Sequence, residues 1–368
     1  MIALRVLLAL AGVALIVAAL DAAIRTFVLP RGVPVQLSRT VFVGVRKAFD
    51  LLARPSRTYE QRDRVMALYA PIALLTLAAT LVVVVWLGYT LLFVAVEDAG
   101  WTDALTTSGS SLLTLGFERP PGTPAVVLAL TEALCGLMLL ALVIAYLPTI
   151  YGAFSRRETA VTRLSVRAGT PPTAWELLER AHRAGYLTEL DELWQQWEEW
   201  FAELSETHTS LASINFFRSP NPHRSWVTAA ACVLDAAALR YAVVRVPWTP
   251  AAGVCIRSGF VALREIADFF DVEHDPDPSP GDPISIARDE FDLVYERLLA
   301  AGVPVVPDQD RAWRDYAGWR VNYDAVLVAL GGLVMAPYAP WSSDRSVARR
   351  LPPLRRRRRG PRPSVPAR

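Results

Sequence analysis

The sequence predicts an all-α membrane protein, and two observations carry this prediction. Of its 368 residues 53% are hydrophobic and the mean hydropathy is +0.28, which is too apolar for an ordinary soluble protein. Three apolar segments, each long enough to cross a bilayer, account for the excess: Ile2–Leu20, Ala67–Val96 and Ala125–Phe154. From Thr173 onward, apolar residues recur at helical spacing among charged ones, as expected for a helical domain in water.

The first apolar segment has two interpretations, a retained span or a cleaved signal peptide. Small residues follow it at positions 18–23, as they do at a signal cleavage site. Residues 22–65, however, hold nine basic residues and three acidic ones, and the positive-inside rule places such a segment in the cytoplasm. Cleavage would leave it outside. We therefore expect residues 1–21 to form a first transmembrane helix and residues 22–66 a basic cytoplasmic loop.

The charges around the other two apolar segments agree with this topology. The connection Glu97–Pro124 carries four acidic residues and one basic residue, so it belongs outside. Four arginines follow the last span on the inner side: Arg156, Arg157, Arg163 and Arg167. We expect residues 67–155 to cross the membrane twice and residues 156–342 to form a helical cytoplasmic domain.

The most informative stretch, Thr106–Phe117 (TTSGSSLLTLGF), lies between these two spans and is too polar to be a span itself. Non-helical backbone at membrane depth persists only where it is buried in protein or lines a water-filled space. Gly116 supplies a position for positive φ, while Thr114 and Leu115 offer carbonyls that can replace an ion's hydration shell.

The order of outer helix, short pore helix, T-x-G-F segment and inner helix resembles the two-helix pore module of potassium channels. The resemblance covers about residues 67–155. It implies a short pore helix over Thr102–Leu113 and a filter at Thr114, Leu115, Gly116 and Phe117. It also implies K⁺ as the permeant ion and a homotetramer, because four loops must surround one ion.

The chain departs from the family pattern directly after this segment. In the family a second glycine and an acid follow the aromatic residue, whereas this chain has Glu118 and Arg119. A glutamate backbone resists the left-handed conformation, so the outermost carbonyl site is placed in doubt. The Glu118 carboxylate would instead form a ring typical of less selective cation pores.

Three residues of the last span are candidates for the ion pathway or its gate. Glu132 is ionisable within a span and therefore functional by default; it either lines the cavity or buttresses the pore helix, and we favour the second. Gly136 lies where the resembling channels place an inner-helix hinge, although close helix packing explains a small residue equally well. Pro148 would bend the helix, so it either shapes a gate or ends the span.

The cytoplasmic part is expected to be helical throughout. Thr173 and Glu176 form a capping-box pattern, and Thr188 is expected to cap a helix with a buried tryptophan stripe. Further helices are expected at Trp226–Val244, Ala251–Phe270, Ile284–Ala301 and Arg311–Met335, whose apolar end is too short to span. The segment His208–Trp226 is interpreted as a structured loop and a candidate interdomain contact.

The chain ends in a basic tail, residues 343–368, which we predict to be disordered. Ten arginines and no acidic residue follow Asp344. The first 344 residues therefore carry a formal charge of about −8, although the whole chain carries +2. Clustered arginine near a membrane is attracted to anionic lipid at about 1 kcal/mol per residue. Because the tail lacks interleaved aromatic residues, we expect lipid contact and no nucleic-acid binding. Only Lys47 among the 38 basic residues is a lysine, a bias typical of GC-rich bacterial genomes, and the expected location is a bacterial cytoplasmic membrane.

No constellation for catalysis or metal binding is evident. The four histidines have no ligand spacing, the three cysteines form no CxxC pair, and the acidic loop Asp271–Asp277 lacks the glycine turn of an EF-hand. We therefore expect no enzyme, no resident metal and no cofactor. The leading hypothesis is a passive cation channel, and the alternative is a membrane-anchored scaffold or sensor whose helical domain is the functional part.

Overall fold

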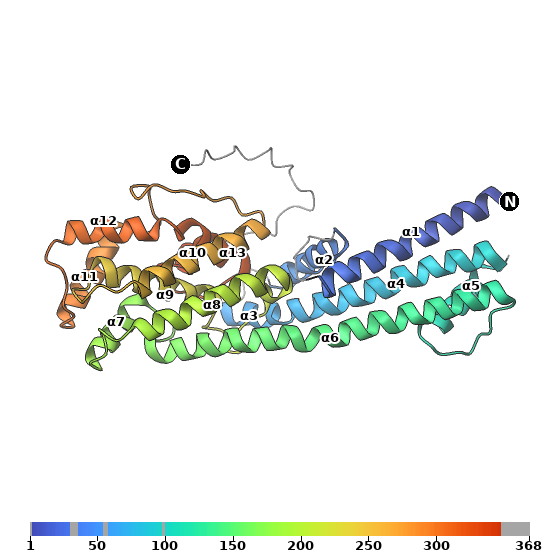
Figure 1. Ribbon diagram of the computed structural model, residues 1–368, viewed down its shortest axis with the longest axis horizontal. Coiled ribbons are helices and arrows are strands. Elements are labelled where there is room, and N and C mark those ends of the chain that lie inside the picture. The colour runs from blue at the N-terminus through green and yellow to red at the C-terminus, as the bar shows by residue number, and fades with distance from the viewer. Residues whose placement is uncertain (1, 30–35, 54–57, 98–99, 347–368) are drawn as a thin grey trace.

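The computed structural model describes residues 2–29, 36–53, 58–97 and 100–346. Within these residues the regular secondary structure is helical, and no strand occurs. The molecule is elongated, with the long helices α1, α4 and α6 side by side at one end and the shorter C-terminal helices gathered at the other (Figure 1). The predicted all-helical architecture is therefore confirmed.

Three of the helices are long and apolar enough to cross a membrane: α1 (Ile2–Phe27), α4 (Tyr69–Glu97) and α6 (Thr123–Ala168). Helices α1 and α4 pack along much of their length, and small residues allow the approach. A Cβ atom added to Gly12 would lie 2.6 Å from the Gly88 carbonyl oxygen, so only glycine fits at this crossing. The three predicted spans are thus helices that a membrane could contain.

The segment between the first two spans differs from the predicted loop, because it folds into α2 (Gln36–Leu52) and α3 (Tyr59–Ala67). Apolar residues of α2 recur on one face, and Phe42 and Phe49 lie with their ring centroids 6.4 and 5.9 Å from the Tyr69 ring at the start of α4. Burial of this apolar face stabilises α2 as a helix, although the segment as a whole is rich in charged residues.

The C-terminal helical region, residues 174–345, packs around helix α9 (Trp226–Ala242), in which every residue except Tyr241 is buried. The predicted tryptophan stripe lies on α8 (Asp191–Ser210) and is buried, which confirms its place in the core. The remaining elements are α7 (Ala174–Arg183), η1 (Ala212–Phe216), α10 (Ala251–Phe269), α11 (Arg288–Ala300), α12 (Gln309–Arg320), α13 (Asp324–Val334) and η2 (Ser343–Arg345).

Two predicted helix caps are wrong. Thr173 precedes α7 as expected, but its side chain makes no capping hydrogen bond, and Glu176 accepts from Arg180 instead. Helix α8 begins at Asp191, three residues after the predicted cap Thr188. The Thr173 hydroxyl is buried and has no hydrogen-bond partner among the described residues.

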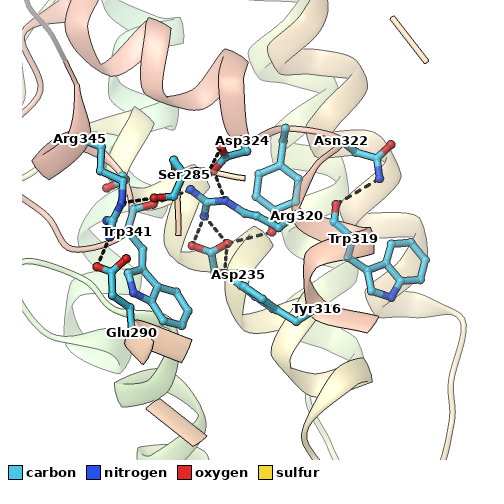
Figure 2. A network of polar contacts seen from close by, with 12 residues as sticks. Asp235, Ser285, Glu290, Tyr316, Trp319, Arg320, Asn322, Asp324, Trp341 and Arg345 are labelled. Carbon is cyan, nitrogen blue, oxygen red and sulfur yellow. Dashed lines mark hydrogen bonds and ion pairs between the residues drawn. The ribbon is translucent and has the colours of Figure 1, made fainter. Parts of the chain in front are cut away.

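The single helix predicted over Arg311–Met335 is wrong, because residues 321–323 form a turn between α12 and α13. Arg320, the last residue of α12, reaches the buried carboxylate of Asp235 on α9 (Figure 2). Nη1 of Arg320 lies 2.5 Å from both Asp235 oxygens, and Nε lies 2.7 Å from Asp324. Tyr323 in the turn donates to the same carboxylate, so the end of α12 and the turn are both tied to α9.

Further hydrogen bonds complete the polar network around Asp235 and Arg320. Tyr316 and Tyr323 donate to Asp235 at 3.2 and 2.9 Å, and Arg320 Nη2 donates to the Trp341 carbonyl oxygen at 2.6 Å. Burial opposes the charge on Arg320, but the adjacent carboxylates outweigh it and hold the pKa of Arg320 well above its ordinary value. The network fixes the packing of α9, α12 and α13.

Of the predicted tail, residues 343–368, the structure describes only residues 343–346. Arg345 donates to the Ser285 carbonyl oxygen and pairs with Glu290, so residues 343–346 belong to the folded region. The arginine-rich stretch Arg355–Arg359 lies outside the described residues.

Candidate functional site

The short helix predicted between the two spans is present as α5 (Trp101–Leu112), one residue earlier than expected. It lies between the ends of α4 and α6 that are remote from the C-terminal helical region (Figure 1). The indole Nε1 of Trp86 on α4 donates to the Leu105 carbonyl oxygen at 3.1 Å. A Cβ atom on Gly109 would lie 3.4 Å from the same nitrogen, so the Trp86 indole packs directly against α5 at this point.

The chain turns sharply where α5 ends. Thr114 and Gly116 both have positive φ, 53° and 72°, and a β-branched residue in this region is strained. The amides of Leu115 and Gly116 donate to the Ser110 carbonyl oxygen at 2.8 and 3.3 Å. The Glu118 amide donates to Ser110 Oγ at 3.1 Å. One serine of α5 therefore holds three amides of the following segment.

The carbonyl oxygens of this segment are in the opposite situation. Among the described residues, nothing donates a hydrogen bond to the carbonyls of residues 114–117. The side chains of Leu115 and Phe117 are exposed within the single chain, at 61% and 64%. These carbonyls are therefore open to water, an ion or further protein as a partner.

Glu132 on α6 contacts α5 from behind. Its side chain is fully buried, and Oε1 lies 2.5 Å from Oγ of Ser108, which also lies 3.1 Å from the Trp86 carbonyl oxygen. Glu132 Oε2 has no hydrogen-bond partner among the described residues. Of the two roles considered for Glu132, this geometry matches the buttress of the short helix and not an exposed cavity wall.

Gly136 lies one turn further along α6, against the end of α5. A Cβ atom there would lie 2.2 Å from the Leu112 carbonyl oxygen, so close packing explains the glycine. Pro148 does not end α6, which continues for twenty residues to Ala168. An apolar cavity of about 270 Å³ lies below the turn, lined in part by Leu113, Thr114 and Leu140.

The two serines that organise this site were not predicted from the sequence. Ser108 joins α5 to α4 and α6, and Ser110 holds the turn. Their signal was the run Ser108–Gly109–Ser110–Ser111, in which small polar side chains replace the apolar face of an ordinary span.

No protein-family model, curated protein or solved structure matches this chain. The functional argument therefore depends on the geometry of the molecule itself. Among the described residues, no group of three or more His, Cys, Asp or Glu side chains is placed to hold a metal ion.

Proposed function

We propose that the protein is a cation channel that conducts mainly K⁺ and assembles as a homotetramer in a bacterial cytoplasmic membrane. The observation that supports this most is the row of unpaired carbonyls at residues 114–117, held at the end of a short helix between two spans. The amides of Leu115, Gly116 and Glu118 donate to Ser110 of the same chain. The carbonyls of residues 114–117 therefore stay available to an ion.

The surroundings of this segment favour a cation. The C-terminal end of α5 carries partial negative charge beside the turn, and the outer connection adds four acidic residues against one basic residue. The exposed side chains of Leu115 and Phe117 fit burial against further copies of the chain, since a filter needs four such segments. Glu118 stands where the potassium-channel pattern has glycine, so other monovalent cations are expected to pass as well.

A flux assay tests the proposal. Purified protein in liposomes should carry K⁺ down a gradient, and protein that carries no monovalent cation at any potential or pH would contradict it. Residues 347–368 are proposed to contact anionic lipid, so we expect the tail to bind vesicles that contain phosphatidylserine.

Substitution of Gly116 by alanine is the sharpest local test. The site has space for a Cβ atom, since nothing lies within 4 Å, but φ is +72°, and left-handed backbone costs a non-glycine residue about 1–2 kcal/mol. We expect Gly116→Ala to lower K⁺ flux by about tenfold or more while the oligomer still assembles.

The matched control is Gly122→Ala. Gly122 has a similar φ of +79° and belongs to the same connection, but it precedes α6 and lies outside the carbonyl row. We expect this variant to retain flux. Equal losses in both variants, or full flux in Gly116→Ala, would show that residues 114–117 do not form the ion pathway.

The alternative proposal, a membrane-anchored scaffold or sensor, makes a different prediction for the oligomer. A groove of about 590 Å³ between α8 and α10 favours a binding role for the C-terminal helical region. Mass measurement of the detergent-solubilised protein separates the two proposals, because a stable monomer or dimer cannot surround an ion with four segments.

A further inference from the structure

Residues 211–219, the junction segment, lie where the inner ends of the spans meet the C-terminal helical region. The segment follows α8, contains η1 and precedes α9. It is part of the stretch singled out as a candidate interdomain contact, and it touches elements from both parts of the molecule.

Arg157 attaches the junction segment to α6. Its guanidinium is 4% exposed and donates to the carbonyl oxygens of Ile214 and Phe217 at 2.9 and 2.8 Å. The adjacent Glu158 accepts from Arg157 and also from Ser219. Because the guanidinium is fully paired, the extension of α6 beyond Pro148 is held as part of the C-terminal helical region.

Arg218 attaches the same segment to α3, the helix that leads into α4. It pairs with Asp63 and donates to the Tyr59 hydroxyl at 2.7 Å. It also donates to the carbonyl oxygens of Val334 and Met335 at the end of α13, both at 2.8 Å. A single side chain therefore joins α3 to the core of the C-terminal helical region.

Phe216 of the junction segment packs between the start of α4 and the end of α10. Its ring centroid lies 5.5 Å from that of Tyr69 at the start of α4 and 5.6 Å from that of Phe270 after α10. The Arg46 guanidinium of α2 lies 5.9 Å from the Phe216 ring. The junction segment thus contacts α6 on one side and α2, α3 and α4 on the other.

We propose that the junction segment couples the C-terminal helical region to the inner ends of α4 and α6, so that a change in that region alters ion flow. The consequence for ion flow rests on the proposed function. Helix α6 enters the region without a break, and α4 reaches it through α3 and Arg218. Relative movement of the two spans at their inner ends therefore requires a rearrangement of residues 211–219.

The test compares an ion pair at the junction segment with one remote from it. Arg218→Gln breaks the pair with Asp63, in which both side chains are about a tenth exposed. The control Arg297→Gln breaks the pair between α11 and Glu179 on α7, at the far end of the region, in which the Arg297 side chain is 49% exposed. We expect Arg218→Gln to change K⁺ flux by about threefold or more, and Arg297→Gln to leave flux unchanged although it removes a tertiary contact of the same region.

Asp63→Asn approaches the same contact from α3 and serves if Arg218→Gln does not fold. It should change flux in the same direction as Arg218→Gln. Flux that is unaltered in both variants, or that follows the melting temperature in all three, would overturn the proposal.

Hydrogen exchange separates this proposal from that of a channel. We expect Arg218→Gln to speed exchange of α6 amides around residues 145–160, which Arg218 does not touch, while Arg297→Gln leaves them protected. This readout needs no ion flow, so a wild-type protein without flux would contradict the channel alone. Unchanged exchange in α6 would contradict the coupling.

Discussion

Two buried carboxylates, Asp235 in the C-terminal helical region and Glu132 in α6, show how differently the two parts of the molecule treat polar groups. Asp235 is 2% exposed and accepts from Arg320, Tyr316 and Tyr323. Glu132 is fully buried as well, but it has one contact, with Ser108, and its second oxygen has no partner among the described residues.

The difference teaches where the chain specifies packing and where it specifies a site. A fully paired network rigidifies a core and directs several helices to one arrangement. A half-paired group costs stability, so its retention in a span indicates a positional role. Both networks can be broken, and the expected losses of stability differ in size and origin.

The largest loss is expected for Arg320→Met, because it leaves Asp235 and Asp324 buried without a cation. Removal of one partner from a buried ion pair costs about 3–5 kcal/mol. Chemical or thermal unfolding of the detergent-solubilised protein, followed by tryptophan fluorescence, measures the change. Arg311→Met on the same helix removes an ion pair whose arginine side chain is 73% exposed, and it should leave the free energy of unfolding nearly unchanged. Equal losses would mean that the network adds nothing beyond an exposed pair.

A smaller loss is expected at Glu132. Glu132→Ala removes the contact with Ser108 and leaves a cavity, at a cost of about 1–3 kcal/mol. Glu132→Gln keeps an acceptor and nearly the same shape, so it should retain most of the stability. The melting temperature of the detergent-solubilised protein compares the two. If glutamine behaves like alanine, the hydrogen bond to Ser108 is not what Glu132 contributes.

The smallest effect concerns His208, a buried group between the two parts. Arg157, Thr207 and Trp226 face its ring, and burial, followed by the charge of Arg157, lowers the pKa of His208 well below its ordinary value. The unfolded chain therefore binds a proton near pH 6.5 that the folded chain does not bind. Stability is fully present above that pH and falls as pH decreases, by at most about 1.4 kcal/mol per pH unit from this group.

His208→Gln should flatten this slope between pH 6.5 and 5, as measured by unfolding at a series of pH values. The exposed control His223→Gln should keep the wild-type slope. An unaltered slope in His208→Gln would show that the buried ring is not the group responsible.

Much of the fold follows from local pattern, and the site follows only in outline. Long apolar runs predicted α4 and α6, the resemblance to the pore module predicted the short helix, and the glycine at position 116 predicted a positive φ there. The pairing of Asp235 with Arg320 could not be predicted, because 85 residues separate them in sequence. The break between α12 and α13 was also missed, since residues 321–323 contain no glycine or proline to mark a turn.

The serine contacts mark the same limit. Ser108 and Ser110 are ordinary helix-surface residues by sequence, and only the packing of α5 against α4 and α6 gives each of them a particular partner. The charge on residues 22–65 similarly suggested a loop, whereas burial of Phe42 and Phe49 against Tyr69 produces a helix.

The unbroken length of α6 has a mechanical consequence. At 46 residues it is about 70 Å long, more than twice the ~30 Å hydrocarbon core. Ala168 lies twenty residues past Pro148, a lever arm of about 30 Å. A bend of about 5° at Pro148 would therefore displace the far end by roughly 2.6 Å, half of one helical turn. A displacement of about 2.6 Å at the far end of α6 thus corresponds to a bend of only about 5° at Pro148.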